Sequence, residues 1–121
     1  MALKAAQDRG RIDAATLAAR LESLRAIPGL MNAALALSDP IAKVAKDLAK
    51  AQDILFLGRG SMFPLALEGA LKLKEISYIH AEGYASGELK HGPIALIDAQ
   101  VPVIVLAPKD ALFDKTVSNM Q

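Results

Sequence analysis

Cysteine and tryptophan are absent from this chain of 121 residues, and aromatic residues make up only 4% of it. Without cysteine there are no disulfides, no thiolate nucleophile and no cysteine-bound zinc. His80 and His91 are the only imidazole groups. The residue types therefore predict no metal site, and the lack of cysteine is compatible with a reducing compartment.

An excess of charge of either sign is missing too. The net charge is +1, from 14 basic and 13 acidic residues. Neutralising phosphates requires a basic face, so we expect no nucleic-acid partner. No stretch approaches the ~20 apolar residues that span a bilayer, and the N-terminus lacks the apolar run of a signal peptide. We therefore expect no membrane association and a cytoplasmic location.

The first half of the chain is rich in alanine and has leucine and isoleucine at helical spacing. Asp13 or Thr16 is positioned to cap a first helix, and Pro28 followed by Gly29 predicts its end. Ser38 before Asp39 and Pro40 is typical of an N-cap with proline in the first turn. The predicted helices span residues 13–26, 29–37 and 40–51.

The pattern changes at Asp53, where a short apolar run predicts a strand buried on both faces. A helix, two further strands and the start of a last helix follow, and Pro102 fits the beginning of the last strand. Their predicted ranges are 54–57, 64–78, 79–84, 101–106 and 110–121. Strands that alternate with helices predict an α/β fold with a parallel sheet. Because three parallel strands leave open edges, we expect the chain to be part of a longer protein.

The turn after the first strand is a candidate anion site. It lies between a buried strand and a helix, where backbone N–H groups and the helix N-terminus favour an anion. Glycines also serve such a turn for steric reasons alone, and an arginine there either binds an anion or is solvated. Both interpretations stay open for the four residues Gly58, Arg59, Gly60 and Ser61.

The helix that follows has an unusual charged stripe, made of Glu68, Lys72 and Glu75. Their spacing of four and three residues places them on one face of a helix. Apolar residues flank the stripe on both sides, so the polar part of the helix surface is narrow. The polar face of a solvent-exposed helix is normally broad. We expect the stripe to face a cleft or a subunit interface. Two carboxylates around an ammonium suit acid–base chemistry, and the alternative is an ordinary ion pair.

The remaining candidates lie around the two histidines. His91 is in a loop with glycine and proline, where a histidine suits proton transfer near neutral pH or is simply solvated. His80 follows an apolar run and is interpreted as structural. Glu82 and Glu88 are expected to make local hydrogen bonds.

Three segments together, residues 57–61, 66–82 and 87–93, closely resemble the second sugar-isomerase (SIS) domain of the glucosamine-6-phosphate synthase family. The resemblance is almost continuous from residue 53 to residue 108. It implies a three-layer, flavodoxin-like SIS fold with a parallel sheet, here incomplete and preceded by helices. Residues 1–38 would connect from a preceding SIS lobe, whose end is residues 1–10, and residues 39–121 would begin the second SIS domain.

The resemblance also assigns roles to the stripe and the loop. The family's catalytic glutamate, which moves a proton between C1 and C2 of the open-chain sugar, falls on Glu75. The preceding lysine and glutamate fall on Lys72 and Glu68, and the histidine associated with ring opening falls on His91. In these roles Glu75 abstracts the proton, Lys72 stabilises the developing negative charge, and His91 exchanges a proton with the ring oxygen.

The family converts fructose 6-phosphate and glutamine to glucosamine 6-phosphate and glutamate, with no metal or organic cofactor. The implied partners are therefore a sugar phosphate and, through the SIS domains, a second copy in a homodimer, because the histidine loop acts across the dimer interface. Nothing in the chain matches the family's glutaminase domain, its first SIS lobe with the phosphate pocket, or its C-terminal lysine. We expect the chain to supply part of an active site and to be inactive alone.

Two alternatives use the same fold. One is a phosphosugar-binding module of a regulator, which needs no catalytic base. The other is a sugar-phosphate isomerase or deglycase without a glutaminase domain. Substitution of Glu75 separates binding from catalysis.

Overall fold

The computed structural model describes residues 1–120 and divides the chain into two compact units, Met1–Lys43 and Val44–Gln121. The order of elements is as follows: α1 (Ala2–Asp8), α2 (Ala14–Leu35), α3 (Ser38–Leu48), β1 (Asp53–Gly58), α4 (Met62–Ser77), β2 (His80–Ala85), the 3₁₀ turns η1 (Ser86–His91) and η2 (Pro93–Leu96), β3 (Val103–Leu106) and α5 (Phe113–Ser118). The predicted last helix is present over residues 113–118, and residue 121 lies outside the described residues.

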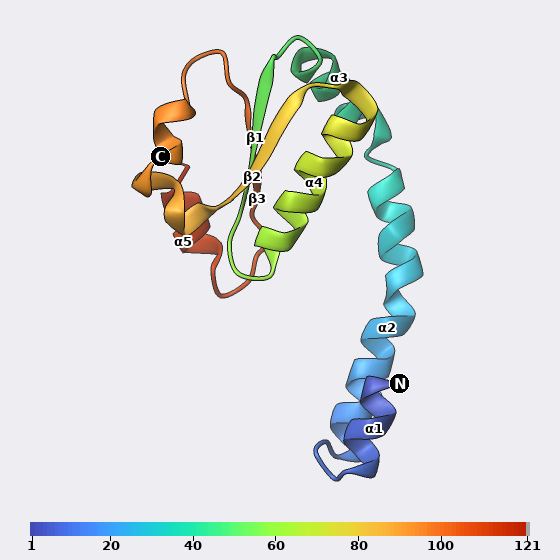
Figure 1. The fold of residues 1–121 in the computed structure, drawn as a ribbon. Coiled ribbons are helices and arrows are strands. Elements are labelled where there is room, and N and C mark those ends of the chain that lie inside the picture. The colour runs from blue at the N-terminus through green and yellow to red at the C-terminus, as the bar shows by residue number, and fades with distance from the viewer. Residues whose placement is uncertain (121) are drawn as a thin grey trace. The chain divides into compact units, whose positions relative to one another are not determined.

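In the first unit, α1 packs beside the beginning of α2 (Figure 1). Asp13 caps α2, because its carboxylate accepts a hydrogen bond from the Thr16 N–H at 2.7 Å. That backbone hydrogen bond is the main cause that lowers the pKa of Asp13. The capping prediction for Asp13 is confirmed.

The prediction that Pro28 ends a helix is wrong. The α2 helix continues through Pro28 and Gly29 to Leu35, so the expected helices 13–26 and 29–37 are one. A proline has the backbone φ of a helix, and its cost is a lost N–H donor and crowding in the preceding turn. Because α2 has no buried residues, the carbonyl left without its partner is open to water.

Ser38 also differs from its predicted role. Helix α3 begins at Ser38, whose hydroxyl donates to the Leu35 carbonyl at 2.7 Å and so bonds back to the end of α2. The predicted cap is therefore wrong, while Pro40 lies in the first turn of α3 as expected.

The second unit contains a three-stranded parallel sheet in the order β2-β1-β3. Its α/β class and parallel strands are confirmed. Central strand β1 is the apolar run, and its residues from Ile54 onward are buried. Pro102 lies just before β3, and its carbonyl accepts a hydrogen bond from Leu55 at 3.0 Å. The proline is therefore tolerated where no N–H is required from it.

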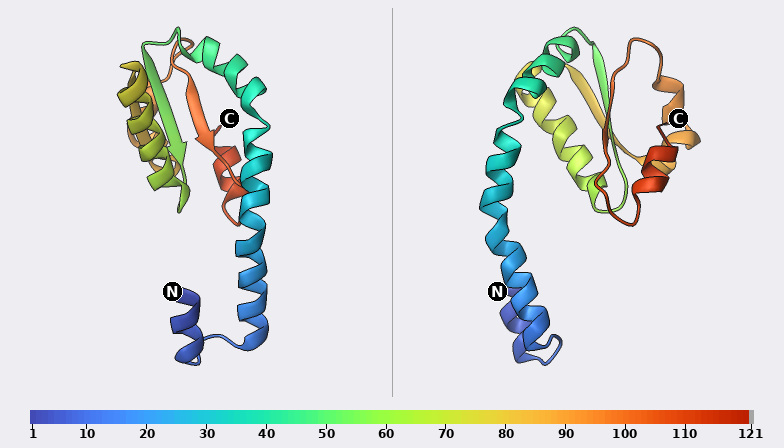
Figure 2. Two further views of the ribbon diagram at one scale, coloured as in Figure 1. Left: turned by 90° about the vertical axis from the view of Figure 1, so that its right-hand side faces the viewer. Right: turned by 180° about the vertical axis from the view of Figure 1, so that it is seen from behind.

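Helix α4 covers one face of the sheet, and η1, η2 and α5 lie on the other (Figures 1 and 2). Successive residues of β1 point to opposite faces, so Ile54 and Phe56 face α4 while Leu55 and Leu57 face the other side. The α4 side forms the core with Ala66, Ala70 and Ala81. Small residues at helical spacing let α4 lie close to the sheet, which fixes the rotation of the helix about its axis.

Candidate functional site

The turn between β1 and α4 positions the charged helix. A methyl group at Gly58 would lie 2.1 Å from the Met62 carbonyl oxygen, and Gly60 has φ +56°. Both positions therefore require glycine for steric reasons. The Met62 and Phe63 N–H groups donate to the carbonyls of Arg59 and Gly60, each at 3.1 Å, and Pro64 has no N–H. Few donors remain at this helix N-terminus, and the Ser61 side chain makes no capping bond.

Glu68, Lys72 and Glu75 form one continuous stripe on α4. The Lys72 Nζ atom lies 2.6 Å from the Glu75 carboxylate and 3.8 Å from that of Glu68. The side chains are 57%, 55% and 49% exposed, in chain order, so a ligand or partner can reach all of them. The stripe is exposed because Ala66 and Ala70, on the opposite side of α4, pack against the sheet.

The hydrogen bond from Lys72 to Glu75 is the main cause that raises the pKa of Lys72. The charge of Glu75 and, less strongly, that of Glu68 act in the same direction. Lys72 is therefore a protonated donor at neutral pH. An ammonium between two carboxylates is available to stabilise negative charge that develops on a bound molecule.

Large apolar side chains flank the stripe and remain exposed. They lie on both sides of it, and Ile76 and Tyr78 are 79% and 94% exposed. The other exposed members are Leu65, Leu67 and Leu71. An apolar surface around a charged centre is typical of a surface that contacts another molecule. The predicted contact with a cleft wall or second subunit stays a prediction.

His91 ends the η1 turn and pairs with Glu88 one turn earlier. Its Nδ1 atom lies 2.9 Å from the Glu88 carboxylate. A carboxylate at Nδ1 favours the tautomer that leaves Nε2 free to exchange a proton. Within residues 1–120, no hydrogen bond or ion pair joins His91 to the stripe on α4.

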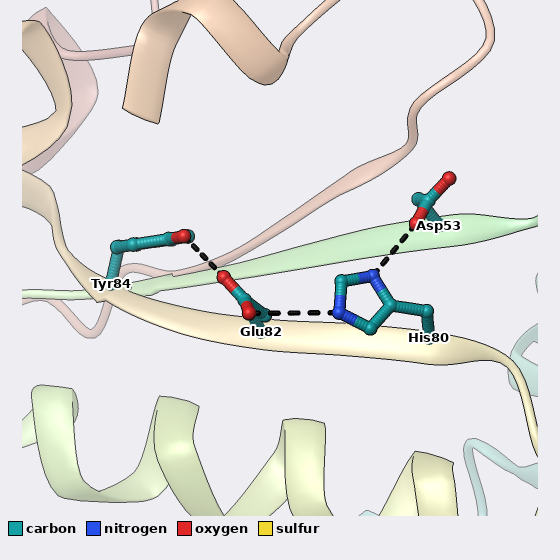
Figure 3. Close-up of polar contacts among 4 residues, drawn as sticks. All are labelled: Asp53, His80, Glu82 and Tyr84. Atoms are coloured by element: carbon teal, nitrogen blue, oxygen red, sulfur yellow. Dashed lines mark hydrogen bonds and ion pairs between the residues drawn. The ribbon is translucent and has the colours of Figure 1, made fainter. Parts of the chain in front are cut away.

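A second polar cluster lies on the sheet face opposite α4 (Figure 3). His80 Nδ1 is 2.7 Å from the Asp53 carboxylate, and its Nε2 is 3.6 Å from Glu82. The Tyr84 hydroxyl donates to Glu82. The register pairs Asp53 with His80 across β1 and β2. His80 therefore joins two strands, and both Glu82 and Glu88 make the local hydrogen bonds expected of them.

The hydrogen bond to Glu82 is also the main cause that raises the pKa of Tyr84. Asp53 and Tyr84 are not among the site residues predicted from the sequence. The alternation His80, Glu82, Tyr84 along one strand is the pattern that places three polar groups on one face. The pairing with Asp53 depends on the strand register, which the local sequence leaves open.

Two cavities lie away from the stripe on α4 and from His91. A cavity of about 180 Å³ is lined by Asp53, His80 and Glu82 at one end of this cluster. A cavity of about 770 Å³ is lined by residues of α1 and α2. In residues 1–120, no three acidic or histidine side chains are arranged to hold a metal ion. No helix in the same residues has the length and hydropathy to cross a membrane.

These features define a class of protein: a parallel α/β domain whose first crossover helix presents an accessible stripe of charged side chains. The sequence model of the SIS domain matches residues 47–120, and the chain belongs to this family.

Similar proteins extend the match over the whole chain. Glutamine–fructose-6-phosphate aminotransferase [isomerizing] from Brucella abortus biovar 1 (strain 9-941) is 60% identical over 121 residues, which are 100% of this chain and 20% of that protein. The enzyme of the same name from Caulobacter vibrioides is 59% identical over 120 residues, 99% of this chain and 20% of its own. This chain therefore spans about a fifth of the length of these curated relatives.

A solved structure gives the same result for the fold. The C-terminal domain of glucosamine-fructose-6-phosphate aminotransferase from Francisella tularensis superimposes with a TM-score of 0.93 at 46% identity. The match covers 98% of this chain and 34% of that one. The chain thus matches the SIS region of this enzyme, and the resemblance deduced from its motifs is confirmed.

Proposed function

We propose that this chain supplies part of the sugar-isomerisation site of a glutamine–fructose-6-phosphate aminotransferase. The reaction converts fructose 6-phosphate and glutamine to glucosamine 6-phosphate and glutamate. The observation that carries the proposal is the accessible stripe Glu68–Lys72–Glu75, in which one ammonium serves two carboxylates. Identity of 60% along the full chain to an enzyme of that name supports it.

In the proposed chemistry Glu75 is the base that moves a proton between C1 and C2 of the open-chain sugar. In the isomerisation of fructose 6-phosphate it takes a proton from C1, the C–H electron pair forms the C1=C2 double bond, and the carbonyl electron pair moves to the C2 oxygen. The carboxylic acid then returns the proton to C2, while the C1 hydroxyl proton passes to the C2 oxygen and the C1=O bond forms. Lys72 donates to the oxygen on which negative charge develops, and Glu68 holds Lys72 from the other side.

His91 would exchange a proton with the ring oxygen when the sugar opens or closes. Glu88 would hold its Nδ1 side, so that Nε2 faces the sugar. We propose that His91 acts at the active site of a second copy in a homodimer, beside the stripe of that copy. The exposed apolar residues beside the stripe suit such an interface.

The residues Gly58, Arg59, Gly60 and Ser61 would lie at the substrate side of the sheet, at the carboxyl end of β1, where ligands of parallel α/β sheets bind. A cytoplasmic location, for which the absence of cysteine gives the support, is part of the same proposal.

The test is a hybrid enzyme. Residues 1–121 replace the corresponding fifth of the Brucella abortus relative, and two reactions are followed: fructose 6-phosphate to glucose 6-phosphate, and formation of glucosamine 6-phosphate. We expect the hybrid to be active in both. Glu75→Gln should lower both rates about 10²- to 10⁴-fold, the usual contribution of a positioned base.

Lys74→Gln is the matched control, because Lys74 is an exposed residue of the same helix outside the stripe. It should retain the activity of the hybrid. An active Glu75→Gln hybrid would contradict the proposed base. If the hybrid and its Glu75→Gln variant both bound fructose 6-phosphate but neither isomerised it, the binding-module alternative would be favoured instead.

A further inference from the structure

We propose that Arg59 and Ser86 together bind one oxyanion group, a phosphate or a carboxylate, at the carboxyl ends of β1 and β2. The site is separate from the α4 stripe and needs no turnover. It gives the residue Arg59 a specific role, carried by its guanidinium rather than by the backbone of the turn.

The strand register brings the two residues together. Gly58 and Ala85 are paired as the last residues of β1 and β2. Arg59 and Ser86 are the residues that follow β1 and β2, so they leave the sheet side by side at its carboxyl edge. In parallel α/β sheets this edge is where ligands bind.

Arg59 is partly buried and carries an unused donor. Its guanidinium lies against Gly87, where a methyl group would be 3.3 Å from Nη2. The Nε atom is buried without a hydrogen-bond partner, and no ion pair within residues 1–120 includes Arg59. A guanidinium stays charged at every pH of interest. Leaving a buried guanidinium N–H without a hydrogen-bond acceptor is costly, so the site favours a partner that accepts from it, and the charge favours an anion.

Ser86 supplies the second unused donor. The residue is 1% exposed, and its hydroxyl has no hydrogen-bond partner in residues 1–120. Its carbonyl is already occupied, because it accepts a hydrogen bond from the Asn119 side chain at the end of α5. The backbone is thereby fixed while the hydroxyl is left available. Buried hydroxyls are normally satisfied, which makes this one informative.

The chemistry of the two donors selects an oxyanion. A guanidinium forms two parallel hydrogen bonds to a carboxylate or phosphate, and a hydroxyl adds a third. The nearest acidic residue in η1, Glu88, is already paired with His91. The amides at the start of α4 are largely used, so the anion depends on side chains.

The experiment titrates the 121-residue chain with inorganic phosphate, and in parallel with acetate, at constant ionic strength. Binding is measured by isothermal titration calorimetry and by the shift in melting temperature. We expect saturable binding of at least one anion. Phosphate alone would indicate a small-molecule phosphate group as the ligand, and acetate as well would indicate a carboxylate. No saturable binding of either anion would overturn the proposal.

Three variants assign the site. Arg59→Lys keeps the charge but loses the paired donors and should bind about tenfold more weakly. Ser86→Ala should weaken binding by a smaller factor. Arg20→Lys, an exposed arginine of α2, is the control and should bind as the parent chain does.

Unchanged affinity in both Arg59→Lys and Ser86→Ala would overturn the proposal, and if circular dichroism shows that one does not fold, the other decides. Glu75→Gln should bind the anion normally. The anion site and the catalytic proposal can therefore fail independently.

Discussion

Helices α2 and α4 are both apolar and both contain an internal glycine, yet only α4 of the two has buried residues. In α4, Ala66 and Ala70 are buried against the sheet. In α2 no residue is buried, and Leu24, Leu30 and Leu35 are exposed. A helix therefore does not become a core helix through apolar content. It becomes one where another surface covers it, as the sheet covers Ala66 and Ala70 of α4.

The contrast extends to how each helix tolerates an irregular residue. Gly29 of α2 has nothing within 4 Å of the position of a methyl group, and Pro28 beside it lies in a continuous helix. Gly69 of α4 lies directly against the Phe56 ring. The same residue type is thus incidental in one helix and required by packing in the other.

The largest expected effect is the loss of stability on substituting a core residue that packs against α4. Phe56→Ala should destabilise the sheet unit by about 3–5 kcal/mol, because it removes a buried ring and leaves a cavity beside Ala70. Urea unfolding measures the change. Ile76→Ala, on the exposed side of the same helix, should have little effect. Equal effects of the two substitutions would contradict the assignment of faces.

The next prediction compares the two glycines directly. Gly29→Ala should stabilise α2 by up to about 1 kcal/mol, the helix propensity difference. Gly69→Ala should instead destabilise, since its methyl group would lie 2.9 Å from the Phe56 ring and overpacking costs about 1–3 kcal/mol. Thermal unfolding followed by circular dichroism gives both values. A gain in stability at Gly69 would show that α4 is not closely packed on Phe56.

A smaller effect concerns the polar face across the sheet from α4. The hydrogen bond from Tyr84 to Glu82 raises the pKa of Tyr84. The stability that this bond contributes is therefore complete at pH values below the ordinary pKa of 10.0, and it is lost as the pH rises through the folded-state pKa. Glu82→Gln should lower the pKa of Tyr84. The measurement is a titration of phenolate absorbance in a Tyr78→Phe background, which leaves one tyrosine.

Glu88→Gln serves as its control and should leave the tyrosine titration unchanged, because Glu88 pairs with His91. If the titration midpoint of Tyr84 were unchanged in Glu82→Gln, the Glu82–Tyr84 hydrogen bond would be ruled out in solution.

The smallest expected effect on stability belongs to the α4 stripe. Lys72→Met should leave the urea midpoint unchanged within error, because its ion pairs are about half exposed and screened by water. Because the pKa of Lys72 is raised, any stability that its ion pairs contribute is complete at pH values below 10.5. It is lost as the pH rises through the folded-state pKa of Lys72. The hybrid enzyme with the same substitution should lose activity. A large loss of stability would make the stripe structural.

Sequence reasoning located the stripe because three charges at helical spacing need no tertiary information to share a face. It placed β1 for a similar reason, since a short apolar run that ends at a glycine is typical of a buried strand. It failed at Pro28, where the local cost of proline is smaller than the cooperative gain of a continuous helix. It also missed the contact between Asp53 and His80, which are distant in sequence.

The amino-acid sequence by itself determined the parallel α/β class, the α4 stripe and the family, because helical and strand periodicity and contiguous motifs are local properties. Only the tertiary structure decided that Arg59 and Ser86 lie side by side with unused donors, that His80 joins two strands, and that Gly69 is needed against Phe56. Each depends on strand register or helix rotation, and these are set by packing between segments that the chain brings together only on folding.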